Sequence, residues 1–329
     1  MTIPTLARLG AAALLALLAQ GALAQPTGKL VLYTSQPNED AQRTVDAFMA
    51  AHPGVEVEWV RDGTTKIMAK LRAEIAAGAP QPDLLLIADT VTMEGLEAEG
   101  LLLSHPEADV SAYEAGLMDP EGHYFSTKLI TTGIAYNPAA PLKPTSYKDL
   151  LAPEATAAMT MPSPMTSGAA TIHMVSIAGH PDLGWDYYAK LAKQGALAQG
   201  GNGGVLKSIA GGEKLYGFLV DFLAIREKAK GAPIEFVFPE EGVSAVTEPV
   251  AILSTAKNPD AAKAFVDFLI SPEGQTLAAE MGYLPAHPDV APPAGFPDRA
   301  QIRLLPFDPA KALAEDEANK LRFTEMFGG

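Results

Sequence analysis

The sequence predicts an α/β fold built on a doubly wound, parallel sheet with helices on both faces. Two apolar runs, at 30–33 and 84–87, and an alternating segment at 55–60 are typical of strands. Between them lie segments whose apolar residues recur at helical spacing. Strands that alternate with helices in this way favour a parallel sheet. Such sheets bind ligands at the carboxyl ends of their strands, here at 34–38, 62–65 and 89–92.

The helices of the first half are bounded by local signals. The first helix is predicted between 38 and 52, because apolar residues at 41, 45, 48 and 49 share one face and a Pro-Gly pair at 53–54 follows. The second helix is predicted between 65 and 78, where apolar residues recur every four positions. Gly78-Ala79-Pro80 ends it, and the third strand follows.

The second half contains more strands separated by Pro-rich and Gly-rich turns. Strands are predicted at 131–137, 159–161, 215–222, 234–238 and 246–253. Helices are predicted after 162–170 and after 200–204, and the latter ends near Gly211. Asn258-Pro259 and Ser271-Pro272 each combine a capping side chain with a proline at the first helical position, so each begins a helix. The tail is predicted to be helical over 309–327.

Composition excludes several classes of protein. The chain has 329 residues, 48 % of them hydrophobic and 19 % charged, which is ordinary for a globular protein and not for a disordered one. Lys and Arg number 24 against 39 Asp and Glu, for a net charge of −15, so we expect no nucleic-acid partner. There is no cysteine, which excludes disulfides, thiolate metal sites, cysteine nucleophiles and a lipid anchor on cysteine.

Residues 1–24 are predicted to be a secretory signal peptide. Arg8 supplies a positive start, residues 11–18 form a short apolar run, and Ala22-Leu23-Ala24 offers small residues where a signal peptidase cuts. The alternative is an N-terminal core helix. No later stretch reaches the ~18 apolar residues that span a bilayer. The sequence therefore predicts an exported, periplasmic protein.

The motifs of common enzymes are missing from the sequence. There is no G-x-S-x-G, no G-x-x-x-x-G-K-[ST], and no G-x-G-x-x-G in the first strand–helix unit. The six histidines are scattered, and none forms an H-x-x-x-H pair. We therefore expect no enzyme, no cofactor and no bound metal.

Two turns are candidate ligand-binding segments. Thr166, Ser167, Gly168 and Ala169 come just before an apolar helix, where free backbone N–H groups and the helix dipole attract an anion. An ordinary helix cap is the alternative. Residues 200–204 place Asn202 among four glycines, which permits close approach of a ligand, although a surface turn would have the same composition.

Polar residues at other strand ends complete the expected site. Ser35 and Thr65 lie in loops at the carboxyl ends of the first two strands. Asp89 follows the third strand, and its alternative role is to cap the next helix. Asp221 follows an apolar strand, where a carboxylate needs a cationic partner from the protein, a ligand amine or a metal. Glu248 is expected at the hinge or in the cleft.

Several of these segments together resemble the solute-binding proteins of ABC importers. The segments are the signal peptide, 30–35, Pro82-Asp83, the Ser167-Gly168-Ala169 turn and 261–275 (AAKAFVDFLISPEGQ). The resemblance covers essentially the whole mature chain, with the ferric-iron and 2-aminoethylphosphonate or phosphate-ester binders as the most similar branch. It implies a type II periplasmic binding fold, in which two doubly wound lobes joined by a two-strand hinge close over a ligand. It also implies a monomer that delivers a small molecule to a membrane permease.

The resemblance places lobe 1 at 28–131 plus 248–285 and lobe 2 at 132–247 plus 286–329. Iron-binding members carry two adjacent tyrosines where this chain has Asp221-Phe222, and phenolates suit ferric ion, so iron or another metal is only an alternative. Their anion-holding turn is matched by Ser167, Gly168 and Ala169, with Asn202 assisting. We therefore expect a 2-aminoethylphosphonate-like ligand with its amine near Asp221 or Asp89; a phosphate ester is the other alternative.

Overall fold

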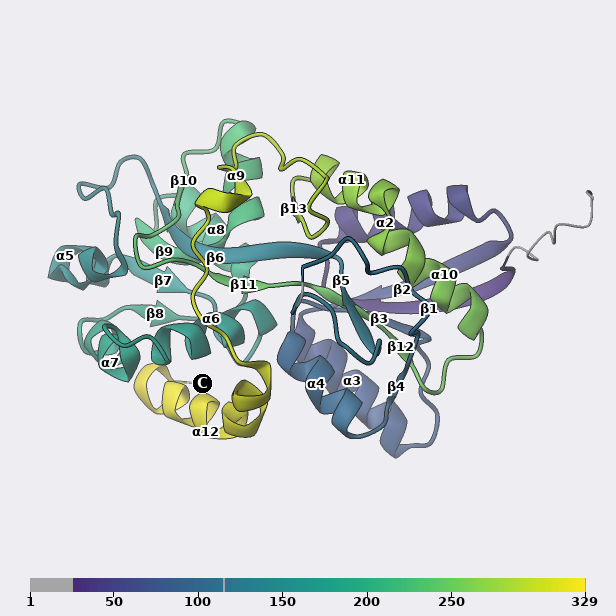
Figure 1. Ribbon diagram of the computed structural model, residues 1–329. Helices are drawn as coiled ribbons and strands as arrows, with labels where there is room; N and C mark the ends of the chain where they lie inside the picture. Colours follow the sequence, from purple (N-terminus) through teal and green to yellow (C-terminus); the bar gives the residue numbers. More distant parts are fainter. Residues whose placement is uncertain (1–25, 115, 329) are drawn as a thin grey trace, which may run out of the picture.

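The protein consists of two α/β lobes, each built around its own sheet (Figure 1). The computed structural model describes residues 26–114 and 116–328, so the predicted signal peptide lies outside the described residues. The strands of the first sheet are β1 (Gly28–Thr34), β2 (Val55–Arg61), β3 (Leu84–Leu86), β4 (Leu102–Leu103), β5 (Tyr124–Ser126) and β12 (Pro249–Leu253). They follow the order β2-β1-β3-β12-β4, and β5 also pairs with β12.

The second sheet is formed by the middle of the chain and one later strand. Its strands are β6 (Lys128–Tyr136), β7 (Met159–Met161), β8 (Leu197–Ala198), β9 (Tyr216–Val220), β10 (Glu235–Val237), β11 (Ser244–Val246) and β13 (Leu284–Pro285). The order is β10-β6-β9-β7-β8, and both β11 and β13 pair with β6.

Both sheets are mixed, whereas the sequence predicts a parallel sheet. β1 does run parallel to β2 and β3, as predicted, and β7 runs parallel to β8 and β9. However, β12 is antiparallel to β3, β4 and β5, and β6 is antiparallel to β9. The physical reason is that β12 enters its sheet directly from the other lobe and not through a helical crossover.

Helices cover both faces of the first sheet, as a doubly wound fold requires. α2 (Asn38–Ala51), α10 (Pro259–Ile270) and α11 (Pro272–Glu280) lie on one face, where Phe48 and Phe265 pack against Leu30 and Leu32. α3 (Thr64–Ala76) and α4 (Thr90–Ala98) cover the other face around Tyr33. Alternate residues of β1 thus supply two separate cores, because successive side chains of a strand point to opposite faces.

The second sheet is covered in the same way. On one face lie α6 (Gly168–Ala178), α7 (Gly184–Lys193) and part of α12 (Pro309–Phe327). On the other face lie α8 (Asn202–Ala210) and α9 (Asp221–Ala229). Short helical turns complete the lobe: η1 (Tyr147–Leu151), α5 (Pro153–Ala157) and η2 (Arg299–Gln301). The predicted strand 215–222 is too long, because Asp221 and Phe222 begin α9.

The chain passes directly from a strand of one sheet to a strand of the other at two adjacent points, and it passes a third time from β12 through α10 and α11 to β13. One crossing joins β5 to β6 through Thr127, and the other joins β11 to β12 through Thr247 and Glu248. The Thr127 hydroxyl donates to the Glu248 carbonyl at 2.7 Å, so the two crossings are hydrogen-bonded to each other. Glu248 has φ 39°, an unusual value for a residue with a side chain. The single strand predicted at 246–253 is therefore two strands in different sheets, while the exact lobe boundaries stay a prediction.

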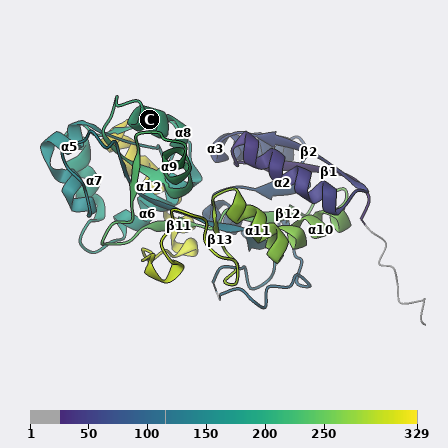
Figure 2. The ribbon, with the colours of Figure 1, turned by 90° about the horizontal axis from the view of Figure 1, so that it is seen from above.

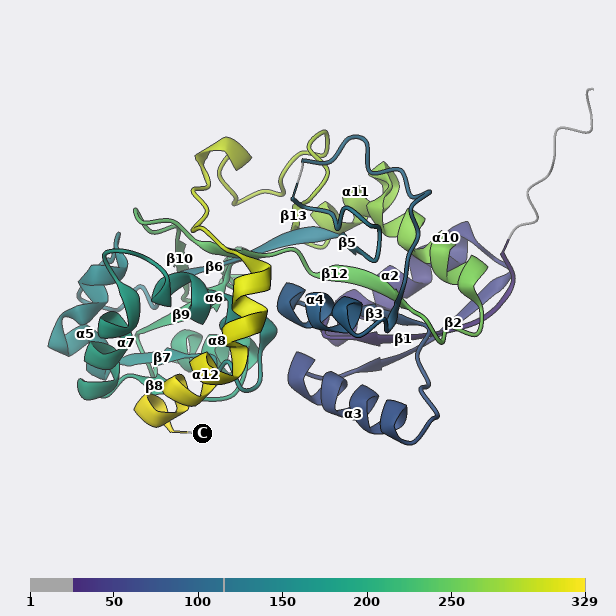
Figure 3. The same ribbon diagram turned by 60° about the horizontal axis from the view of Figure 1, so that its bottom comes forward.

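Helix α12 contacts both lobes (Figure 3). Its first half packs beside α4 of the first lobe, where Leu313 faces Gly95. Its second half packs on α7 of the second lobe, where the Phe323 ring lies 5.5 Å from the Tyr188 ring. None of the helices within the described residues combines the length and the apolar character needed to cross a bilayer.

Candidate ligand cleft

A cleft of about 770 Å³ lies between the lobes (the two lobes are seen side by side in Figure 2). The first lobe contributes the ends of β1 and β2, the start of α3 and the loop after β3; the second lobe contributes the starts of α6, α8 and α9. Seven expected site residues line it: Ser35, Thr65, Thr166, Ser167, Ala169, Asn202 and Glu248. Gly168, Asp89 and Asp221 do not.

Three helices begin at this cleft, which makes it a positive electrostatic environment. Thr64, the first residue of α3, and Asn202, the first residue of α8, are in its wall, and α6 contributes its cap Ser167 and its second residue Ala169. The backbone N–H groups of Gly168 and Ala169, and those of Asn202 and Gly203, donate to no acceptor in the described part of the chain. Free N–H groups at a helix start carry partial positive charge and bind anions. The two helix starts in the second lobe therefore have four backbone donors without an acceptor, three of them on residues of the cleft wall.

Ser167 and Asn202 join these two helix starts. The Ser167 Oγ accepts hydrogen bonds from the Ala170 N–H at 3.3 Å and from the Asn202 Nδ2 at 3.2 Å. Asn202 is held in turn by its Oδ1, which accepts from the Val220 N–H at 3.3 Å. The Ser167 hydroxyl hydrogen has no acceptor among the described residues, so it remains free to donate to an anion. Both readings of this turn hold: Ser167 caps α6 and also lines the cleft.

Two of the lining hydroxyls already have partners in the protein. Thr166 Oγ1 donates to the Gly200 carbonyl at 2.6 Å and so connects the two turns that the sequence singles out. Ser35 Oγ accepts from the Ala88 N–H at 2.9 Å, which fixes the loop after β3. The Thr166 hydrogen is thus used within the protein, whereas Ser35, which only accepts among the described residues, keeps its hydroxyl hydrogen for a ligand, as Ser167 does.

Two cations at the cleft were not predicted from the sequence. Arg61 donates a hydrogen bond of 2.7 Å from Nε to the Gln36 carbonyl. The two terminal nitrogens of its guanidinium take no part in this bond. Lys66 lies 3.7 Å from Asp62 in an exposed ion pair. Their position in the sequence could have identified them, since Arg61 and Lys66 flank the loop at 62–65, one of the strand ends where the sequence predicts ligand binding. Their charges add to the field of the helix starts.

Gly168 allows the lobes to touch and does not serve the approach of a ligand. A Cβ atom at this position would lie 2.4 Å from the Ala88 carbonyl oxygen and 2.6 Å from the Asp89 Cβ, both in the other lobe. Gly63 at the start of α3 similarly faces the Thr166 carbonyl, with 3.0 Å available for a Cβ. Glycine is therefore needed at 168 because the first turn of α6 packs directly on the loop after β3.

The structure does not bring Asp221 to the cleft, contrary to the expected amine-binding role. Its side chain is buried, and its carboxylate accepts from the Thr131 N–H at 2.9 Å, the Thr131 hydroxyl at 2.7 Å and the Phe222 N–H at 2.6 Å. Burial raises the pKa of Asp221 to about 7, although these hydrogen bonds act in the opposite direction. Asp221 thus ties the start of α9 to β6.

Asp89 is also turned away from the cleft. Its carboxylate accepts from the Thr92 N–H at 3.2 Å and from the Thr92 hydroxyl at 2.6 Å, so it is the N-cap of α4. Burial raises the pKa of this carboxyl as well. The alternative that the sequence left open, a helix cap, is the one that the structure shows.

Glu248 reaches the cleft from a group of buried charges at the crossings. It forms an ion pair with Lys128, and burial raises the pKa of Glu248 while the lysine opposes this shift. Nearby, Arg226 of the second lobe makes two hydrogen bonds of 2.9 Å to the carboxylate of Asp40 in the first lobe. The Tyr283 hydroxyl donates to the same carboxylate. The lobes are therefore joined by a bidentate ion pair beside the cleft.

The cleft does not offer the donors that ferric ion prefers. Within the described residues its wall contains no tyrosine and no histidine, and its two carboxylates, Asp62 and Glu248, each have a lysine partner. Hard anionic oxygens from several side chains are what a ferric site requires. The arrangement fits an anion better than a cation.

Two lobes with a ligand cleft between them at two crossing strands define the type II class of periplasmic binding protein. The chain belongs to the bacterial extracellular solute-binding protein family, whose model matches residues 7–284. An uncharacterized protein of Haemophilus influenzae is 30 % identical over 283 residues, 80 % of this chain and 79 % of that protein. Members of this family bind solutes, which agrees with the prediction that the protein is not an enzyme.

Solved structures share the fold. The periplasmic binding protein AfuA of Actinobacillus pleuropneumoniae, with exogenous fructose-6-phosphate bound, has a TM-score of 0.83 and 23 % identity, covering 91 % of this chain and 98 % of that one. Iron-bound HitA from Pseudomonas aeruginosa has a TM-score of 0.77 and 21 % identity, covering 91 % and 99 %. These likenesses confirm the predicted fold class of two α/β lobes.

Proposed function

We propose that the protein captures a small organophosphorus anion, a phosphate ester or a phosphonate, in the periplasm and delivers it to the permease of an ABC importer. The observation that carries this proposal is the pair of helix starts, α6 and α8, which have four free N–H groups and place Ala169, Asn202 and Gly203 in the cleft wall beside the Ser167 hydroxyl. Hydrogen bonds to a charged group contribute ~1.5–3 kcal/mol each. Four or five of them outweigh the cost of association and give micromolar affinity or better.

The lining favours an ester or simple phosphonate over the aminated ligand expected from the sequence. An ammonium group needs a free carboxylate, but Asp221 and Asp89 lie outside the cleft wall, and Asp62 and Glu248 are paired with lysines. Arg61 and Lys66 add positive charge on the opposite side. The fructose-6-phosphate bound to AfuA, a protein of the same fold, is itself a phosphate ester.

In this proposal the ligand is enclosed by rotation of the lobes about the two crossings near Thr127 and Glu248. The rigid bodies are 28–131 plus 248–285 and 132–247 plus 286–329, after removal of the signal peptide at 1–24. Closure would shift the population toward a form that the permease recognises. The protein would act as a monomer.

A ligand screen tests the proposal directly. Thermal unfolding is measured with hexose phosphates, glycerol phosphate, 2-aminoethylphosphonate, a simple alkylphosphonate, sulfate and ferric citrate, and titration calorimetry follows for each compound that stabilises. A ligand at 100 times its dissociation constant adds ~2.7 kcal/mol of stability. We expect an ester or alkylphosphonate to give the largest shift. A shift with ferric citrate alone would contradict the proposal.

Ser167→Ala provides the matched variant for this screen. Loss of one charge-assisted hydrogen bond should weaken binding of the best organophosphorus ligand about 10- to 100-fold. Ser271→Ala is the control, because Ser271 caps α11 in the same way, accepting from the Gly274 N–H at 3.1 Å, but lies outside the cleft lining. Equal affinity of the two variants would refute the proposed role of the α6 turn.

A further inference from the structure

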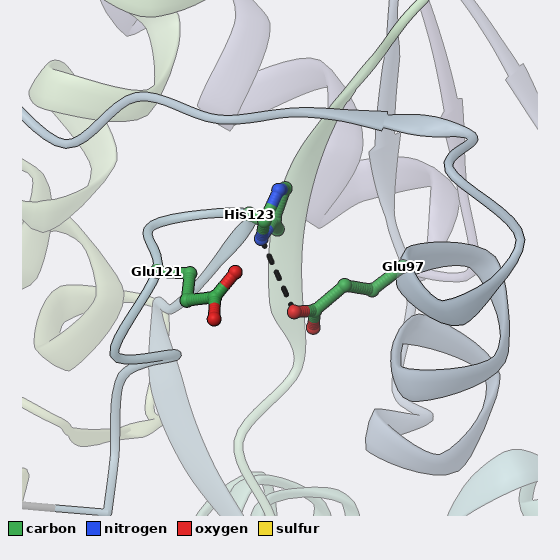
Figure 4. A group of neighbouring side chains, drawn as sticks. All are labelled: Glu97, Glu121 and His123. Carbon is green, nitrogen blue, oxygen red and sulfur yellow. Dashed lines mark ion pairs between the residues drawn. The ribbon is translucent and has the colours of Figure 1, made fainter.

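A group of acidic side chains surrounds His123 in the first lobe, outside the cleft lining. Glu97 comes from the last turn of α4, while Asp119, Glu121 and His123 come from the loop that leads into β5. Figure 4 shows the carboxylates of Glu97 and Glu121 turned toward the same nitrogen of His123 from opposite sides. The α4 end and the loop are thus joined through one imidazole.

The distances suit a single ion with little movement of the side chains. One ligand atom each from Glu97, Glu121 and His123 lie within 4.8 Å of one another. The Nδ1 of His123 is 3.2 Å from a Glu97 oxygen and 3.3 Å from the Asp119 Oδ2. Two atoms bound to one zinc ion at ~2.1 Å lie at most ~4.2 Å apart. Small rotations of the exposed Glu121 side chain would bring the ligand atoms of Glu97, Glu121 and His123 within that range.

The loop that carries these residues is held in place by its own backbone. The Gly122 N–H donates to the Asp119 carbonyl at 3.1 Å, and Gly122 adopts φ 74°. The Asp119 Oδ2 accepts from the His123 N–H at 2.8 Å. Asp119 is nearly buried, with 6 % of its side chain exposed, and its Oδ2 also lies against the imidazole, so the loop holds His123 in place.

Negative charge in this group is not balanced by the protein. Glu94, Glu97, Asp119 and Glu121 surround the site, and none of them forms an ion pair with a lysine or arginine within residues 26–114 and 116–328. Four carboxylates thus surround a single imidazole, which is the neighbour that two of them share. A divalent cation would supply the missing charge.

We propose that Glu97, Glu121 and His123 bind one divalent transition-metal ion beside Asp119, with Zn²⁺ as the preferred occupant. One imidazole with carboxylates is a donor set that first-row metals accept, whereas Ca²⁺ and Mg²⁺ prefer oxygen ligands alone. The ion would fasten the connection from β4 to β5 to the end of α4. That connection, residues 104–123, forms no helix or strand in its described part, so the site would be structural and separate from the ligand cleft.

Calorimetry on tag-free, EDTA-treated protein tests this site with ZnCl₂, MnCl₂ and CaCl₂ as probes. We expect one Zn²⁺ per chain and a rise in the unfolding temperature. His123→Gln and Glu121→Gln should each weaken Zn²⁺ binding at least tenfold. Because Glu121 is exposed, its substitution leaves the fold intact even if that of His123 does not.

His180→Gln is the matched control, since the His180 Nδ1 accepts from the Asp182 N–H in a turn of the other lobe. This control should bind Zn²⁺ like the wild type. Absence of saturable 1:1 binding, unchanged affinity in both the His123 and Glu121 variants, or Ca²⁺ binding as tight as Zn²⁺ would each overturn the proposal. Zn²⁺ binding can fail while the organophosphorus screen succeeds, so the two proposals are tested independently.

Discussion

Replacing Gly168 with alanine tests whether close contact of the lobes is required for ligand binding. The added Cβ would lie 2.4 Å from the Ala88 carbonyl oxygen, about 1 Å closer than an ordinary van der Waals contact. The obstacle is backbone on both sides, so either the first turn of α6 or the loop after β3 must move. Overpacking of this kind costs about 1–3 kcal/mol. The displaced turn carries the N–H groups of Gly168 and Ala169, which are proposed to hold the anion.

We expect Gly168→Ala to weaken binding of the best organophosphorus ligand about 5- to 150-fold, the ratio that corresponds to 1–3 kcal/mol. The assay is titration calorimetry, with urea unfolding of the free protein measured in parallel. Gly95→Ala in α4 is the control, because its nearest neighbour to a Cβ is the Leu313 side chain at 3.4 Å and the change favours the helix. If both variants bound the ligand equally well, the contact at Gly168 would not belong to the bound state.

Three further predictions concern stability. Asp221 keeps a proton in the folded protein between its ordinary pKa of 3.8 and its raised pKa of about 7, so this group lowers stability as pH rises through that window. We therefore expect the unfolding free energy of Asp221→Asn, measured by urea unfolding, to rise by about 3 kcal/mol relative to that of the wild type between pH 5 and pH 8. The same pH dependence of unfolding free energy in both proteins would contradict this. Arg226→Gln leaves the buried Asp40 carboxylate unpaired and should cost about 3 kcal/mol in urea unfolding, whereas a loss below about 1 kcal/mol would mean that the pair is not formed. Phe323→Ala, at a site 2 % exposed, should lower the unfolding free energy by about 3–5 kcal/mol. The control Leu321→Ala, at a site 62 % exposed, should lower it by less than about 0.5 kcal/mol. Similar losses in the two variants would show that Phe323 does not pack on α7.

The first lobe was largely predictable because its signals are local. The order from β1 to β3 follows from apolar runs and from Pro and Gly residues that end each helix, and the structure confirms it. The cap residues Asn258 and Ser271 were also predicted, and both accept the expected backbone hydrogen bonds. Signals of this kind depend on neighbours within four residues, which the sequence displays directly.

The errors arise where partners are distant in sequence. One strand was predicted across 246–253, although Glu248 was expected at the hinge or in the cleft, and the structure shows that Thr247 and Glu248 separate β11 from β12. Asp221 was assigned to a ligand because its partner Thr131 lies 90 positions away. Arg61 and Lys66 were missed because exposed cations are common, and only the position of the cleft singles them out. The turn at Ser167, which does line the cleft, was selected because the start of a helix has a local sequence signature; its role in anion binding stays a prediction.

The attachment of α12 to both lobes limits how the molecule can move. Leu313 beside α4 and Phe323 beside α7 are ten positions apart, about 15 Å along the helix axis. A rotation of the lobes about the crossing strands alone would separate either Leu313 from α4 or Phe323 from α7. Separation of the lobes would therefore require α12 to slide along α4 or α7. Packed helices slide by only about 1–2 Å before their side chains must repack. If the lobes rotate as proposed, the contacts of α12 with both of them limit how far they can separate.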